Sequence, residues 1–112
     1  MSRDKEAFDR LYNGNPWRRT VEIARDHKVI IACLIRAADW RPLSALWWRK
    51  KSVSIIAVDL SGNFFLHHSD GGVRYWDHRT QTEMKVAGGI LEFCSKIEET
   101  PELIVGFRPD LH

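Results

Sequence analysis

The chain has 112 residues, of which 44% are hydrophobic and 29% are charged, and its formal net charge is +2. This composition is typical of a folded protein and excludes a disordered one, and the length suits a single domain over residues 1–112. No apolar run approaches the ~18 residues of a membrane span, and no apolar stretch of a signal peptide follows the charged N-terminus. We therefore expect a cytoplasmic protein with no membrane association.

Two cysteines, Cys33 and Cys94, lie on otherwise apolar segments. A reducing compartment and apolar neighbours favour two separate thiols over a disulfide. We therefore predict that both cysteines are buried and pack as small hydrophobic residues.

The N-terminal part of the chain predicts two short helices. In the first, apolar residues recur at helical spacing and Asn13-Gly14 provides the stop; the apolar residues are Ala7, Phe8, Leu11 and Tyr12. Asn15 and Pro16 then resemble the cap and first turn of a second helix. Its predicted apolar stripe consists of Trp17, Val21 and Ala24.

The middle of the chain predicts an antiparallel sheet. Residues 29–35 form a short apolar run that is rich in β-branched side chains, which indicates a buried strand. A helix that continues from residue 28 is the alternative. Residues 53–58, 64–68 and 73–76 follow as three short strands joined by tight turns, the pattern of a β-meander. Residues 84–86 are a candidate for one more strand.

Strand and turn chemistry make two local predictions within this meander. Alternation along residues 64–68 assigns side chains to opposite faces, with Phe64, Leu66 and His68 on one and Phe65 and His67 on the other. The turn before this strand contains Asp59, Gly62 and Asn63, whose side chains and backbone freedom are those of a tight reversal. We assign these three residues a structural role.

The last regular element predicted is an amphipathic helix that ends near Glu99, because Pro101 disfavours helix at the residue before it. Its apolar stripe consists of Ala87, Ile90, Leu91, Cys94 and Ile97. Residues 103–107 follow as a short strand or a packed tail. The predicted fold class is therefore α+β, with N-terminal helices, an antiparallel β-meander sheet and a C-terminal amphipathic helix packed on the sheet.

Histidines and acidic residues near the meander turns invite a metal-site interpretation. However, His67 and His68 are adjacent on a strand and point to opposite faces, and no metal-ligand spacing accompanies them. Ser61 lacks the flanking glycines of a nucleophile elbow, and Cys94 lies on the apolar side of a helix. We therefore predict no catalytic residue, no metal and no cofactor, and keep a small hydrolase or metal-binding protein around His67, His68 and His78 as an alternative.

Aromatic and basic residues are interleaved in segment 40–51, which includes Trp40, Trp47 and Trp48. Such a segment can stack nucleobases, anchor a protein interface or place tryptophans in the core. The low net charge argues against a dedicated nucleic-acid binder, which we keep as an alternative function. Because three tryptophans are many for one small core, a homodimer that buries them is a further interpretation.

Residues 55–97 resemble the central segment of the SUKH superfamily of small α+β proteins. Three motifs carry the resemblance: the strand and turn of residues 55–63 with Asp59, Ser61, Gly62 and Asn63; the strand that closes in Tyr75-Trp76-Asp77-His78; and the helix with Glu92-Phe93. Many members of this superfamily act in bacteria as immunity proteins against toxins.

The resemblance implies a non-catalytic protein-binding module that sequesters a partner protein such as a toxin. Under this hypothesis the candidate contact residues are Trp76, Asp77 and His78, together with Trp47 and Trp48. A large aromatic side chain surrounded by polar groups is the expected anatomy of a protein-binding anchor.

Overall fold

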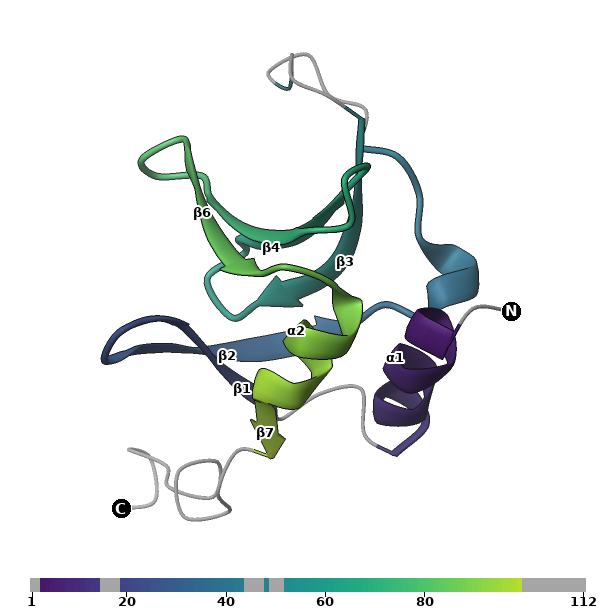
Figure 1. Ribbon diagram of the computed structural model, residues 1–112. Helices are drawn as coiled ribbons and strands as arrows, with labels where there is room; N and C mark the ends of the chain where they lie inside the picture. The colour runs from purple at the N-terminus through teal and green to yellow at the C-terminus, as the bar shows by residue number, and fades with distance from the viewer. Residues whose placement is uncertain (1–2, 15–18, 44–47, 49–51, 100–112) are drawn as a thin grey trace.

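The computed structural model describes residues 3–14, 19–43, 48 and 52–99. It contains an N-terminal helix, a curled sheet and a C-terminal helix (Figure 1). In chain order the elements are α1 (Arg3–Gly14), β1 (Arg19–Ala24), β2 (His27–Leu34), the 3-10 turn η1 (Ala37–Asp39), β3 (Val53–Asp59), β4 (Phe64–His68), β5 (Val73–Asp77), β6 (Thr82–Ala87), α2 (Ile90–Lys96) and β7 (Ile97–Glu99).

The sheet has seven strands in the order β6-β5-β4-β3-β2-β1-β7, and every neighbouring pair is antiparallel. Six of these strands follow one another in sequence, so the predicted meander is confirmed and extends further than expected. The α+β class is confirmed as well. Neither α1 nor α2, the two α-helices among the described residues, has the length and apolar content that crossing a membrane requires.

The second predicted helix is wrong, because residues 19–24 form strand β1 instead. Val21 and Ile23 are both buried and Glu22 between them is exposed, which is the alternation of a strand. The prediction joined Val21 to Ala24 at helical spacing and overlooked this alternation. Trp17, which was part of the predicted stripe, lies outside the described residues.

The C-terminal helix is confirmed, but it ends at Lys96, three residues before the predicted end at Glu99. Residues 97–99 instead become β7 and pair with β1, where Val21 faces Ile97. This pairing satisfies backbone groups of β1 that would otherwise form an open sheet edge. Residues 103–107, predicted as a strand or tail, lie outside the described part of the chain.

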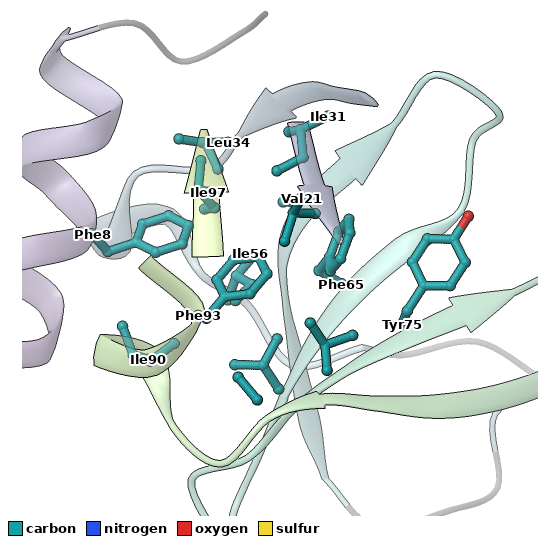
Figure 2. Close-up of a cluster of buried hydrophobic side chains, with 14 of the residues drawn as sticks. Phe8, Val21, Ile31, Leu34, Ile56, Phe65, Tyr75, Ile90, Phe93 and Ile97 are labelled. Carbon is teal, nitrogen blue, oxygen red and sulfur yellow. The ribbon is translucent and has the colours of Figure 1, made fainter. Parts of the chain in front are cut away.

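The main core lies between the two helices and one face of the sheet (Figure 2). Phe8 of α1 and Phe93 of α2 stack with ring centroids 6.4 Å apart, and Phe93 also meets Phe65 of β4 at 5.3 Å. All three rings are fully buried. Aromatic packing therefore helps to hold both helices on the sheet.

The opposite face of the sheet carries a second, smaller cluster of Trp48, Val53, Leu66 and Trp76. Phe64 packs against this cluster, whereas Phe65 belongs to the main core. The predicted alternation along β4 is therefore confirmed. Both faces of β4 are covered by apolar side chains, and its first three residues, Phe64, Phe65 and Leu66, are all hydrophobic.

Replacement of Phe93 by alanine should lower the free energy of unfolding by roughly 3–5 kcal/mol, because it leaves a cavity between α1, α2 and β4. Urea unfolding measures the change. Leu91→Ala on the same helix is the matched control, since Leu91 is 44% exposed, and it should change stability by less than about 0.5 kcal/mol. Equal losses in the two variants would contradict this description of the core.

Candidate functional site

A groove of about 850 Å³ opens at the end of the sheet where β3 turns into β4. We call it the hairpin groove, and its lining residues are 27–30, 59–61, 63, 75 and 77–79. One wall is the β1–β2 hairpin, the other is the end of β5 with the turn that leads into β6, and the β3–β4 turn lies between them (Figure 1).

Strand register explains why this groove exists. Ile31 of β2 pairs with Asp59, the last residue of β3, so residues 27–30 project beyond the end of β3. On the other side, Phe64 at the start of β4 pairs with Trp76, so β5 continues past β4 at Asp77. The two middle strands are therefore shorter at this end than the hairpins that flank them.

The β3–β4 turn at the bottom of the groove is built around Asp59. Its Oδ1 accepts hydrogen bonds from the backbone N–H groups of Ser61 and Asn63, each at 2.9 Å. Gly62 adopts φ +85°, a conformation that side-chain-bearing residues rarely take. The turn is thus defined by one carboxylate and one glycine, as the residue types in this segment suggest.

A buried hydrogen-bond network joins this turn to β5. The Tyr75 hydroxyl donates to Asp59 Oδ2, and the Asn63 side-chain amide donates to the Tyr75 oxygen at 2.9 Å. Asn63 Oδ1 in turn accepts from the backbone N–H of His78 at 2.9 Å. Asp59, Asn63 and Tyr75 are all buried. We call these three side chains the polar node.

The polar node also sets the protonation of Tyr75. Burial, followed by the hydrogen bond to Asp59, raises the pKa of Tyr75 to about 12. Tyr75 is therefore a neutral donor at physiological pH. Because the Asp59 carboxylate already accepts three hydrogen bonds, from Tyr75, Ser61 and Asn63, it is suited to hold the turn and poorly suited to act as a base.

The structure separates the predicted contact residues. Trp76 is only 5% exposed and packs edge-to-face on Trp48, with ring centroids 5.5 Å apart. Its indole N–H donates to His78 Nδ1 at 3.1 Å. Asp77 and His78 line the hairpin groove, while Trp76 and Trp48 belong to the cluster on the outer sheet face. Trp47 lies outside the described residues.

Several groove residues were not predicted from the sequence: Tyr75 as a hydrogen-bond donor, and His27, Lys28, Leu60 and Arg79 as lining residues. Tyr75 lies on β5, the second strand after the Asp–Asn turn, so no local spacing in the sequence points to the side-chain bond between Tyr75 and Asp59. No signal in the sequence points to residues 27 and 28, because the spacing of Val21 and Ala24 predicts a helix where the structure has the first strand of a hairpin.

The histidines of β4 lie on opposite faces, as their adjacency requires. His67 contacts Trp40 in the main core, and burial lowers its pKa, whereas His68 Nε2 lies 2.6 Å from Glu83 Oε2. Within residues 3–14, 19–43, 48 and 52–99, no three His, Cys, Asp or Glu side chains are grouped to hold a metal ion.

The cysteines are both free thiols and are partly buried, where full burial was expected. Burial raises the pKa of Cys94 to about 11, so this thiol is protonated and unreactive at neutral pH. Ser61 is exposed in the β3–β4 turn, where its backbone N–H serves Asp59. These surroundings give neither Cys94 nor Ser61 the features of an activated nucleophile.

Compared with protein-family models, curated proteins and solved structures, the chain matches none of them. The resemblance to the SUKH superfamily therefore stays a prediction based on the motifs of residues 55–97.

Ionisation of Tyr75 should be displaced to about pH 12 in the folded protein, from 10.0 for an ordinary tyrosine. The pKa of Tyr75 is higher in the folded protein than in the unfolded chain. The contribution of Tyr75 to the free energy of unfolding is therefore complete below pH 10 and is lost as the pH rises toward 12. Tyrosinate absorbance should therefore show a late step that disappears in Tyr75→Phe and remains in Tyr12→Phe. A late step that survives in Tyr75→Phe would contradict the polar node.

Truncation of Trp76 should destabilise the fold rather than remove a surface contact. We expect Trp76→Ala to lower the free energy of unfolding by ~3–5 kcal/mol, because the indole fills the cluster with Trp48 and Leu66. Trp76→Phe retains a ring and loses the bond to His78, and its loss should be smaller, about 1–2 kcal/mol. Chemical denaturation measures both, and an unchanged melt of Trp76→Ala would assign the indole to the surface instead.

Proposed function

We propose that the chain is a non-catalytic protein-binding module that captures a partner protein in the hairpin groove. The observation that carries this proposal is Leu60, which is 68% exposed at the tip of the β3–β4 turn and lines the groove. Its position is held by a hydrogen bond from its own N–H to the Ile30 carbonyl at 3.0 Å and by the turn around Asp59.

The surroundings of Leu60 support a protein partner. Val29 and Ile30 add apolar surface inside the groove, and the rim is polar and charged, with His27, Asp77 and Arg79. An apolar centre with a polar rim is the usual anatomy of a protein interface. Because the turn is held by internal hydrogen bonds, little conformational entropy would be lost when a partner binds.

The biological role that we propose is sequestration of a toxin, in the manner of an immunity protein of the SUKH type. This part of the proposal rests on the motifs of residues 55–97, in which Asp59, Asn63 and Tyr75 form the polar node under the groove. Such a role requires tight binding and no turnover. It also places the chain in the cytoplasm, where it would meet the toxin before the toxin acts.

The proposal does not require a second copy of the chain. Two of the tryptophans that suggested a homodimer pack internally: Trp40 lies 5.0 Å from Phe8, and Trp48 lies against Trp76. The Trp40 indole N–H donates to the Ile35 carbonyl at 2.7 Å, and the partly buried ring packs against the main core. The same packing reduces the aromatic surface that a nucleic-acid binder would use for stacking.

A pull-down from lysate of the source cell, with wild-type and Leu60→Asp proteins as parallel baits, tests the proposal. The wild type should retain a protein at high salt, and Leu60→Asp should lose it, because a charge replaces the apolar centre of the interface. Leu91→Asp is the control, since Leu91 is exposed on α2 outside the groove. Circular dichroism should show that all three proteins are folded.

Two outcomes would contradict the proposal. One is equal retention of the partner by wild type and Leu60→Asp. The other is recovery of nucleic acid that is released as salt is raised, which would favour segment 40–51 as the binding element.

A further inference from the structure

The edge of β2 inside the hairpin groove has no neighbouring strand among the described residues. The ladder between β2 and β3 ends where the N–H of Leu60 donates to the Ile30 carbonyl. Backbone groups of alternate residues point to the same side of a strand, so the N–H and C=O of Lys28 also face the groove. On its other side Lys28 faces Glu22 of β1.

The dimensions of the groove suit one extended peptide. Residues 27–30 present about 13 Å of strand edge, which is the length of about four extended residues. In the sheet order, β3 and β4 separate β2 from β5, so their early end leaves three strand spacings, about 14 Å, between the two walls. One added strand fills the first spacing, and long side chains can bridge the remainder to Arg79.

The charged side chains of the groove that are exposed, rather than buried or partly buried, are basic. Lys28 and Arg79 are exposed on opposite walls, with His27 beside Lys28. Of the two carboxylates in the lining, Asp59 is buried in the polar node, and the partly exposed Asp77 accepts the backbone N–H of Arg79 through Oδ1 at 2.8 Å. Lys28 lies 3.5 Å from Glu98, but both side chains are more than half exposed, and such a pair contributes little.

We propose that an extended, acidic segment of the partner protein binds in the hairpin groove by adding as a strand to the free edge of β2. The added strand pairs with the backbone of Lys28, and its carboxylates lie near Lys28 and Arg79. Main-chain hydrogen bonds supply affinity in this mode, and the side chains supply specificity. The inference rests on the proposed function, because it specifies how the same groove recognises its partner.

Selection from a displayed library of random heptapeptides on the wild-type protein tests the charge preference. The enriched peptides should be rich in Asp, Glu and β-branched residues. Arg79→Glu should weaken the best of them about tenfold, because it replaces an attractive charge by a repulsive one. Arg10→Glu makes the same change in net charge on an exposed residue of α1, and it should leave affinity unchanged.

An N-methyl scan of the best peptide tests strand addition. Methylation of the amides that face β2 should weaken binding about tenfold at each position, and methylation of the intervening amides should have little effect. On the protein side, Lys28→Pro removes the groove-facing N–H, whereas Lys28→Ala removes only the charge. Lys28→Pro should therefore bind more weakly than Lys28→Ala, provided that thermal melts show both to be folded; the peptide scan decides the question without either variant.

Several results would overturn the inference: no enriched peptide, enrichment of basic peptides, equal effects of Arg79→Glu and Arg10→Glu, or uniform effects along the N-methyl scan. A dimer in solution that Arg79→Glu dissociates would also overturn it, by making a second copy the occupant. If Leu60→Asp loses the partner while the scan shows no alternation, the proposed function stands and only the strand-addition mode fails. If Leu60→Asp keeps the partner, the proposed function itself fails.

Discussion

The Asp59 carboxylate, buried where β3 turns into β4, is the interaction on which the open end of the sheet depends. It accepts hydrogen bonds from its own turn and from Tyr75 on β5, so one side chain joins three consecutive strands. A buried carboxylate is costly unless it is fully hydrogen-bonded, and here every bond also defines geometry. Loss of Asp59 would release both the turn and the end of β5.

A second constraint is that the central strands are covered on both faces. The helices and their phenylalanines cover one face, and Trp48 with Trp76 covers the other. This arrangement explains why so small a chain carries several tryptophans without requiring a partner to bury those that the structure describes. It also means that Trp76, although it lies next to two groove residues in sequence, acts through packing and through its bond to His78.

The two constraints together produce the hairpin groove. The polar node holds the turn between β3 and β4 and ties it to β5, while Trp76 at the end of β5 packs in the cluster on the opposite face of the sheet. Leu60 is then presented on a fixed turn between two projecting hairpins, with Lys28 and Arg79 on either side. Leu60, Val29 and Ile30 supply the apolar part of this groove, while the carboxylate at its bottom is engaged in internal hydrogen bonds.

Much of the fold could be predicted from the sequence, because local patterns decide it. The meander strands, the Asp59–Asn63 turn and the amphipathic helix each follow from periodicity or turn chemistry within a few residues. What local patterns could not decide is what depends on pairing between distant segments. Residues 19–24 became a strand because β2 and β7 lie on either side of them, and residues 97–99 left the helix to pair with β1.

The candidate site divides in the same way. The sequence by itself determined that Asp59, Gly62 and Asn63 form a turn and that His67 and His68 face apart, since both are properties of neighbouring residues. Only the tertiary structure decided that Tyr75 completes the polar node, that Trp76 is buried and that Lys28 and Arg79 flank one groove. These relations depend on strand register across the sheet, which brings together residues that no spacing along the chain connects.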